Sequence, residues 1–171
     1  MHLWATRELA DEIVVGAVSA SEKNVYFVFA MVFAVVIGYA ATYGPSHNSW
    51  LYVYEGAVVG VITLAGAQKV TLSYGRAIDG EFFEMAYLLS VPLLVKTTLA
   101  SWVAIWGGYW LFSILVPNLP VPESDEAYRA LSYWAGRLWQ VFPFLVSVTI
   151  AVVYWYRLAY HVTYVVNRRG A

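Results

Sequence analysis

The sequence predicts an all-α integral membrane protein with four transmembrane helices, short loops and interfacial lead-in helices. Of its 171 residues, 61% are hydrophobic and only 12% are charged, whereas an ordinary soluble domain carries about 25% charged residues. Four apolar runs, at residues 25–43, 50–73, 92–116 and 139–161, are long enough to cross a hydrocarbon core, which takes about 20 residues. We therefore interpret residues 1–171 as one polytopic membrane domain.

Charged residues are rare within these four runs. The first run has none, and it also lacks the polar stripe that a helix of a soluble bundle shows every 3.6 residues. The second run contains Glu55 and Lys69, the third contains only Lys96, and the fourth contains Arg157 near its end. The runs therefore favour membrane-spanning helices over the alternative, a soluble bundle of apolar helices.

Two segments predict helices that lead into the bilayer. Residues 79–91 precede Pro92, and residues 123–140 precede Pro143. Because proline removes a backbone hydrogen bond, it bends a helix in which it lies. We expect both segments to lie near the membrane interface and then to turn into the bilayer at the proline.

Residues 5–18 predict a third helix at the interface. Leu9, Ile13 and Val14 are positioned to face lipid, and the charged residues between positions 7 and 12 are positioned to face water. This pattern is typical of a helix that lies in the plane of the membrane surface. A plain cytoplasmic helix is the alternative interpretation.

The distribution of Lys and Arg predicts a protein of the cell (inner) membrane with both termini in the cytoplasm. Cytoplasmic segments of membrane proteins are enriched in these two residues. The loop at 44–49 has neither, and the loop at 117–129 is acidic apart from Arg129. Basic residues occur instead before the first run, in the second connection and at the C-terminus, namely Arg7, Lys23, Arg76, Arg168 and Arg169.

Small residues recur at helical spacing in the first three predicted spans. Such residues let the backbones of membrane helices approach closely. We expect the three spans to meet along these stripes, and a seam between two copies of the chain is the alternative. The stripes include Ala34, Gly38, Gly56, Gly60, Ala100, Ala104 and Gly108.

Tryptophan and tyrosine concentrate near the ends of the predicted spans. Trp50, Trp106 and Trp139 lie at the expected outer interface, and Tyr154 and Tyr160 lie toward the inner one. Rings in these positions are typical of the aromatic belts that anchor helices at headgroup depth. A site for an aromatic cofactor or a quinone is the alternative.

Ionisable residues within a membrane are candidates for function. Glu55 and Arg137 lie on different predicted spans at similar depth near the outer face. We expect them to form a structural polar pair. The alternatives are that both side chains reach water or that Glu55 is a transport carboxylate.

A second set of polar residues is expected at the inner face, and it comprises Lys69, Lys96, Arg157 and His161. The simplest interpretation is that these side chains reach the interface and pair locally. They also fit a site for anionic lipid headgroups or a polar path for an anion. Acidic partners are available in the second connection, at Asp79, Glu81 and Glu84.

The residue types exclude several functions. The chain has no cysteine and a net charge of −1, which argues against thiolate metal sites and against binding of nucleic acid. Of the three histidines, His47 is expected on the opposite membrane face from His161, whereas haem or zinc ligation needs ligands at one depth. With no pairing of a nucleophile and a base, we expect no metal, no cofactor and no catalysis.

One family shares this layout in outline. Tyr43 is followed by Trp50 and Glu55, the pair Gly66–Ala67 is followed by Arg76 and Asp79, and Pro143 lies in the last span. The chain resembles the small membrane subunit of TRAP-type transporters, which depend on a periplasmic binding protein. The resemblance lies in these residues, in the length of the chain and in its four predicted spans. The chain departs from that family because Thr42 replaces an arginine, the acid Glu55 stands alone and the inner loop has few basic residues. The resemblance implies a scaffolding subunit that braces a larger transport subunit.

Two main functional hypotheses follow. The first is a non-catalytic structural subunit of a larger membrane complex, with a secondary transporter as one candidate for that complex. The second is an autonomous homo-oligomeric channel or carrier, and a membrane enzyme that binds lipid or quinone is a remote third. The partners expected are membrane lipids together with another membrane protein or a second copy of the chain.

Overall fold

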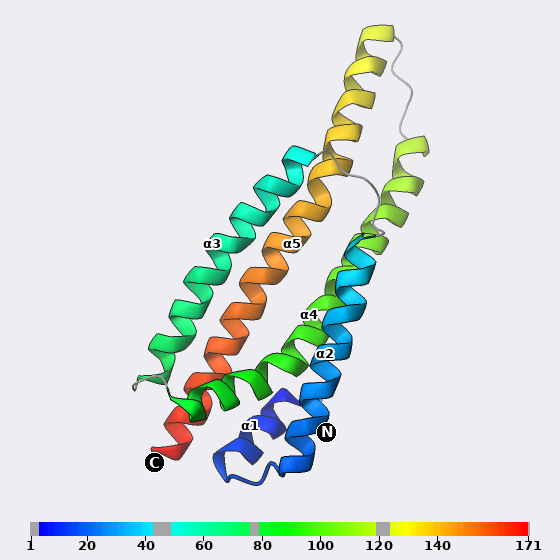
Figure 1. Cartoon of the computed structure of the whole chain (residues 1–171). Coiled ribbons are helices and arrows are strands. Elements are labelled where there is room, and N and C mark those ends of the chain that lie inside the picture. The colour runs from blue at the N-terminus through cyan, green and yellow to red at the C-terminus, as the bar shows by residue number, and fades with distance from the viewer. Residues whose placement is uncertain (1–3, 43–48, 76–78, 119–123, 171) are drawn as a thin grey trace.

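The computed structural model describes residues 4–42, 49–75, 79–118 and 124–170, and within these residues it consists of helices and their connections. The helices are α1 (Thr6–Val14), α2 (Ala20–Thr42), α3 (Ser49–Tyr74), α4 (Gly80–Leu115), the short 3-10 helix η1 (Val116–Asn118) and α5 (Asp125–Arg169). Helices α2 and α4 run in one direction along the molecule and α3 and α5 run back, so that both ends of the chain lie together (Figure 1). The sequence predicts this shared side for the termini and the second connection.

Three of the described helical segments are long and apolar enough to cross a membrane, namely Val53–Tyr74, Gly80–Asn118 and Asp125–Arg169. They contain the predicted spans 92–116 and 139–161 and most of the span 50–73. The remaining predicted span, 25–43, coincides with helix α2 over residues 25–42. Part of that span lies outside the residues whose side chains the structure describes.

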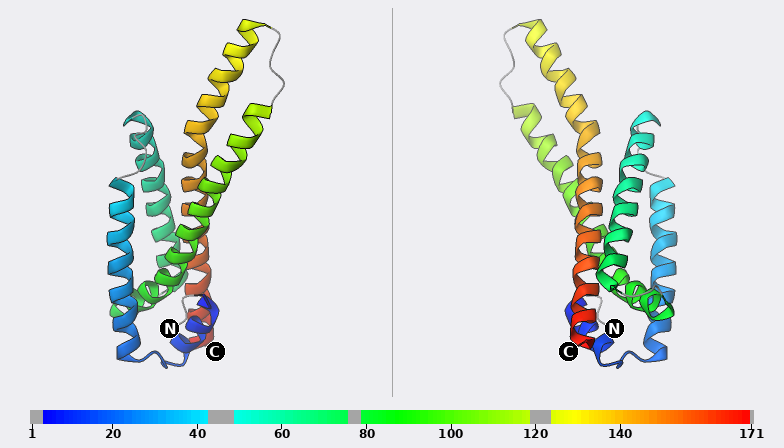
Figure 2. Two further views of the ribbon diagram at one scale, coloured as in Figure 1. Left: turned by 90° about the vertical axis from the view of Figure 1, so that its right-hand side faces the viewer. Right: turned by 90° about the vertical axis from the view of Figure 1, so that its left-hand side faces the viewer.

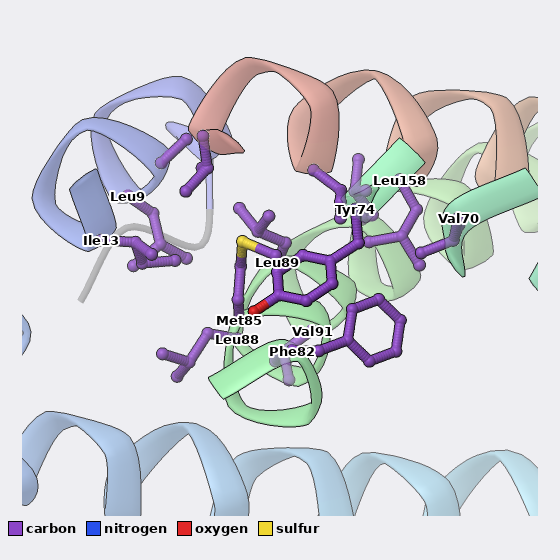
Figure 3. Packing of buried hydrophobic residues seen from close by; sticks show 14 of the residues in the cluster. Leu9, Ile13, Val70, Tyr74, Phe82, Met85, Leu88, Leu89, Val91 and Leu158 are labelled. Atoms are coloured by element: carbon purple, nitrogen blue, oxygen red, sulfur yellow. The ribbon is translucent and has the colours of Figure 1, made fainter. Parts of the chain in front are cut away.

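The hydrophobic core lies at one end of the molecule, which we call the packed end. There α1, the last turns of α3, the first turns of α4 and the last turns of α5 meet (Figure 3). Leu9, Leu89, Val162 and Val165 are fully buried in this core. Tyr26 of α2 is also buried, and its carbonyl accepts a hydrogen bond of 3.1 Å from the hydroxyl of Tyr87.

Helix α1 is part of this core, which corrects the expectation that its apolar face lies against lipid. Leu9, Ala10 and Ile13 are at most 5% exposed and pack within the protein. The hydroxyl of Tyr164 donates a hydrogen bond of 2.5 Å to Asp11. An apolar helix face gains similar free energy from burial in protein or in lipid, so the sequence pattern alone cannot distinguish the two.

The first turns of α4 correspond to the predicted lead-in helix at residues 79–91, and α4 then bends. Figure 2 shows that the first turns of α4 run across the bundle between α2 and α5, and that the rest of α4 then runs along α5. Pro92 lies inside α4 and is buried, and proline bends a helix because it removes one backbone hydrogen bond. The lead-in segment also belongs to the packed core, since Phe82, Met85 and Leu88 are buried there.

The second predicted lead-in segment behaves differently. Residues 125–140 form one continuous helix with the rest of α5 through Pro143, and together with the end of α4 they project past α2 and α3 rather than folding across them (Figure 1). We call this end of the molecule, where α4 stops at Leu115 and α5 begins at Asp125, the open end. At 1.5 Å per residue, the 45 residues of α5 extend over about 67 Å.

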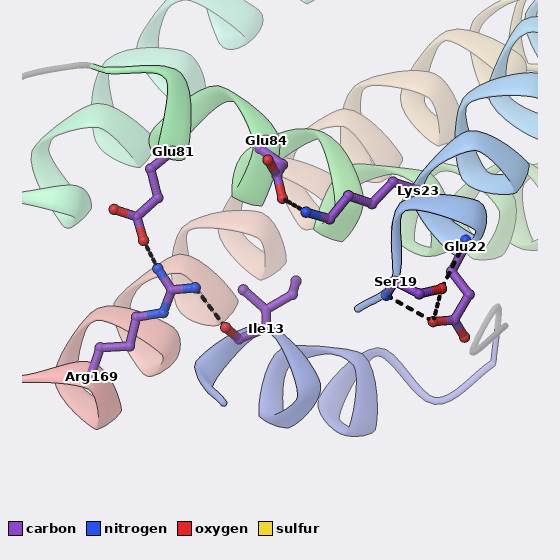
Figure 4. A network of polar contacts seen from close by, with 7 residues as sticks. All are labelled: Ile13, Ser19, Glu22, Lys23, Glu81, Glu84 and Arg169. Carbon is purple, nitrogen blue, oxygen red and sulfur yellow. Dashed lines mark hydrogen bonds and ion pairs between the residues drawn. The ribbon is translucent and has the colours of Figure 1, made fainter. Parts of the chain in front are cut away.

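Short polar signals begin and end the helices. Ser19 and Glu22 form a capping box before α2, in which each side chain accepts a hydrogen bond from the backbone N–H of the other (Figure 4). Asp79 accepts a hydrogen bond of 2.8 Å from the N–H of Phe82 and so begins α4. Such caps satisfy N–H groups that have no partner within the helix. Gly75 ends α3 with φ at +67°, a conformation that glycine adopts without steric cost.

The small residues pack differently from the expectation. In the described residues, the stripes of α3 and α4 do not form one shared seam, and α3 and α4 each pack on α5. The closest approaches are Gly66 against Trp155 and Gly108 against Phe142. A Cβ atom on Gly56 or Gly60 would meet nothing within 4 Å, and Ala100 and Ala104 are exposed. Ala34 and Gly38 lie outside the residues whose side chains are described.

Candidate functional site

A cavity of about 480 Å³ lies at the packed end. Its walls come from the residues around the start of α1, from α4 just after the bend, and from α5 near its C-terminal third. Because α1 is held by the core and by Tyr164, these three elements keep a fixed relation to one another. The cavity is therefore built from segments that are far apart in the sequence.

Basic side chains line the cavity, and among the described residues no carboxylate does. Arg7, Lys96 and Arg157 contribute their charges, and His161 adds an imidazole. Lys96 donates a hydrogen bond of 2.8 Å from Nζ to the hydroxyl of Thr6, which is a neutral partner. Arg157 has no hydrogen bond or ion pair with another described residue. The cavity therefore concentrates positive charge that the described part of the chain leaves unbalanced.

His161 is the buried member of this group. The residue is only 7% exposed, and within the described part of the chain its Nδ1 atom has no hydrogen-bond partner. A buried polar atom without a partner is costly, and its retention requires an explanation. Here the imidazole is packed edge-on against Tyr160, with 5.4 Å between ring centroids, beside the cationic wall of the cavity.

The acidic residues that were candidates to neutralise this cluster are engaged elsewhere. Glu81 pairs with Arg169, and Glu84 pairs with Lys23 at 2.5 Å (Figure 4). Asp79 accepts a hydrogen bond from the hydroxyl of Tyr74 at 3.1 Å. These contacts join α4 to α2, α3 and α5 at the packed end. The three acids therefore do not neutralise the basic side chains of the cavity.

Arg169 also fastens α1 to the bundle. Its guanidinium pairs with Glu81 and donates a second hydrogen bond of 2.6 Å to the carbonyl of Ile13 (Figure 4). A cation beside the last carbonyls of a helix is favourable because these carbonyls have no partner within the helix. One side chain thus joins the ends of α1 and α5 to the start of α4.

The part of the cavity nearer the open end is apolar. It includes Ala100 of α4 and Ile150 and Val153 of α5. Since α4 runs from the packed end to the open end and α5 runs back, these residues lie about one to two turns closer to the open end than Lys96 and Arg157. The cavity is therefore cationic toward the packed end and apolar toward the middle of the helices.

Lys69 does not belong to the cavity. Its ammonium lies 4.7 Å from the centroid of the Tyr156 ring, in a cation–π contact between α3 and α5. The structure thus brings together Lys96, Arg157 and His161 of the predicted cluster and separates Lys69 from them.

Glu55 and Arg137 are not paired with each other. Arg137 donates a hydrogen bond of 3.1 Å to the hydroxyl of Tyr133 on its own helix, and Glu55 has no ion pair with another described residue. Gly66 of α3 meets Trp155 of α5, and the two helices run in the same direction. That register places Arg137 about two turns nearer the open end than Glu55, so the expected pair does not form.

The contribution of α1 and the residues before it was not evident from the sequence. Trp4, Thr6 and Arg7 line the cavity, whereas the sequence predicts either a helix at the membrane surface or a plain cytoplasmic helix for residues 5–18. The only signal is the amphipathic pattern itself, which shows that the helix needs an apolar surface and does not say which one.

A separate apolar hollow of about 320 Å³ lies between α4 and α5 near the open end. Gly108 and Phe142 contribute to it, and Trp139 stacks there on Tyr109 with 4.2 Å between ring centroids. Of the described residues that line it, Tyr109 alone has an ionisable side chain. These side chains offer shape and apolar contact, and they supply no acid–base pair.

Metal ligation finds no support in the described residues, where no group of three or more His, Asp or Glu side chains could hold an ion. Comparisons of the sequence with family models and with curated proteins gave no match, and the structure matches no solved structure. The cationic cavity is consequently the candidate site on the strength of its own geometry.

Proposed function

We propose that the chain is a multi-pass protein of the cell (inner) membrane that serves as a non-catalytic structural subunit of a larger membrane complex. It spans the membrane four times, with α2 as the first span, and both termini lie in the cytoplasm. The low content of charge, the three long apolar helices and the placement of Lys and Arg support this assignment.

The observation that carries the proposal is the apolar hairpin at the open end. The paired helices α4 and α5 project past the ends of α2 and α3 (Figure 2). Apolar side chains on this hairpin are more than 60% exposed, namely Trp106, Trp110, Trp134 and Leu138. The length of α5, about 67 Å, exceeds the roughly 40–45 Å of a whole bilayer. A helix longer than the bilayer is thick has part of its surface outside the lipid, and an exposed apolar surface there favours burial against a protein partner.

The larger complex that we propose is a secondary transporter of the TRAP type. The residues that support this choice are those of the resemblance, above all Trp50, Glu55 and Pro143. In that assembly the chain would brace the transport subunit and would contribute no substrate site. A homo-oligomeric channel or carrier is the competing function, and the experiment below separates the two.

Site-directed crosslinking tests the proposal, because the chain has no cysteine of its own. Trp134→Cys and Val61→Cys each introduce one thiol at an exposed position, on the hairpin and on α3 respectively. Each thiol is labelled with benzophenone maleimide in native membranes and then irradiated. We expect Trp134→Cys to give a discrete protein adduct and Val61→Cys, the control, to give none.

The mass of the adduct decides between the functions. A heavier protein joined to the 19.2 kDa chain supports the structural subunit. An adduct of twice the chain mass contradicts it and supports a homo-oligomer, for which transport by the purified protein in liposomes is the next assay. If Trp134→Cys gives no protein adduct, the hairpin has no protein partner and the proposal is wrong.

A further inference from the structure

We infer that the cavity lined by Lys96, Arg157 and His161 binds a phosphate-type anion, carried by the headgroup of an anionic membrane lipid. The inference rests on the membrane placement in the proposed function and does not depend on a protein partner. Lipid binding and crosslinking therefore succeed or fail separately.

Charge is the first step of the argument. Arg7, Lys96 and Arg157 line one cavity, to which the described part of the chain contributes no carboxylate. The two acids in the first turns of α4, Glu81 and Glu84, are paired with Arg169 and Lys23. Clustered basic side chains with no acidic partner attract an anion, and a basic pocket between membrane helices on the cytoplasmic side is a typical site for anionic headgroups.

Hydrogen-bonding capacity is the second step. Lys96 uses one of its donors on the hydroxyl of Thr6, and an ammonium has three. Arg157 has no partner among the described residues, and a guanidinium has five donors in a planar fork that matches phosphate oxygens. Beside them, the buried His161 has an unpartnered Nδ1. Lys96 and Arg157 therefore keep N–H groups available for an anion, beside the buried imidazole of His161.

The shape of the cavity is the third step, and it favours a lipid as the source of the phosphate. The apolar wall of Ala100, Ile150 and Val153 lies on the side toward the open end. A lipid whose headgroup contacts Lys96 and Arg157 would extend its acyl chains along this wall, in the direction of the bilayer centre. A free phosphate has no apolar group that could pack against that wall.

Thermal unfolding of the purified chain in neutral detergent tests the site. Short-chain phosphatidylglycerol, phosphatidylcholine of the same chain length, or inorganic phosphate at constant ionic strength is titrated in, and tryptophan fluorescence reports Tm. We expect phosphatidylglycerol to raise Tm more than phosphatidylcholine does. If phosphatidylglycerol raises Tm and inorganic phosphate does not, the site binds a lipid headgroup. If phosphate raises Tm as much as phosphatidylglycerol does, the site binds an anion and its natural ligand is free phosphate.

The variants locate the effect in the cavity. Arg157→Gln removes a cation that forms no hydrogen bond or ion pair with another described residue, so the fold should persist. We expect it to raise the half-saturating concentration about fivefold, as expected for one basic residue near an anionic group. Arg137→Gln, which removes a cation from the far end of the same helix, is the control and should leave it unchanged.

A second comparison separates binding from folding. Lys96→Gln removes a charge together with the hydrogen bond to Thr6, whereas Thr6→Val removes the hydrogen bond alone. We expect only Lys96→Gln to weaken the lipid effect. The inference is wrong if wild type and Arg157→Gln respond equally to phosphatidylglycerol and to phosphate, or if Arg137→Gln weakens the response as much as Arg157→Gln.

Discussion

At the scale of single residues, close packing between α3 and α5 depends on Gly66. A Cβ atom at this position would lie 2.6 Å from the Cβ and 2.2 Å from the Cγ of Trp155. The Cβ of Trp155 is fixed by its backbone, so rotation of the side chain cannot relieve the overlap. The two helices would have to move apart, and α3 would lose its closest contact with the rest of the molecule.

We therefore predict that Gly66→Ala destabilises the chain by about 1–3 kcal/mol, the usual cost of overpacking. Gly60→Ala is the matched control on the same helix, because a Cβ there meets nothing within 4 Å. It should be neutral or stabilising by up to about 1 kcal/mol, since alanine favours helix over glycine. Thermal unfolding in detergent, followed by circular dichroism, measures both. Equal stability of the two variants would show that α3 does not approach α5 at Gly66.

The separation of Glu55 from Arg137 leads to a second prediction at this scale. Arg137 is bound to Tyr133, so the two charges should contribute independently to stability. In a double-mutant cycle with Glu55→Gln and Arg137→Gln, we expect the effects on unfolding to add within about 0.5 kcal/mol. A coupling energy well above that value would mean that the two side chains pair in the folded protein.

At the scale of elements, α1 is an integral part of the bundle. Leu9 and Ala10 are fully buried, Arg169 binds the carbonyl of Ile13, and Tyr164 binds Asp11. The helix has nine residues, and a helix this short is marginal in water without tertiary contacts. Its stability therefore comes from the packed end, and the packed end in turn depends on it to form the cavity.

Truncation of a buried side chain on α1 tests this dependence. We predict that Leu9→Ala lowers the free energy of unfolding by about 2–5 kcal/mol, the usual cost of a cavity in a packed core. Val15→Ala, just after the helix, is the control because Val15 is 74% exposed. Thermal unfolding in detergent gives the comparison. If Leu9→Ala destabilises the chain no more than Val15→Ala does, α1 is not packed in the core, and the interpretation of α1 as a helix at the membrane surface is favoured.

The extent of the long helices is predictable from the sequence, whereas the choice of partner for each helix is not. The run at 50–73 corresponds to α3, Ser49–Tyr74, because an apolar run of that length favours a helix in any apolar setting. The stripes of small residues show which helix faces permit close approach, but Gly56 and Gly60 lie open while Gly66 is in contact. Small side chains permit many pairings, so they do not specify one.

The sequence predicts how far along each helix the residues of the candidate site lie. It does not predict which face of the helix each side chain occupies. Lys69, Lys96 and Arg157 all lie toward the packed end, as their positions along the predicted spans indicate. Whether such residues share a cavity depends on how each helix is rotated, which tertiary packing decides. Lys69 consequently contacts Tyr156 while the other two line the cavity.

At the scale of the whole molecule, the two ends differ in kind. The packed end has a buried core, ion pairs and the cationic cavity, and the open end has exposed aromatic side chains. This polarity suits a protein whose packed end lies at the cytoplasmic membrane surface, where basic residues are favoured. The lipid site and the partner surface that we propose both depend on this orientation.

Cysteine accessibility tests that orientation most directly. Glu126→Cys and Gly170→Cys each place a single thiol at an exposed position, at the open and the packed end respectively. Intact cells are treated with a membrane-impermeant maleimide, with permeabilised cells as the control for reactivity. We predict that Glu126→Cys is labelled in intact cells and that Gly170→Cys is labelled only after permeabilisation. Labelling of Gly170→Cys in intact cells, with protection of Glu126→Cys, would contradict the orientation, and labelling or protection of both would contradict a membrane between the two ends.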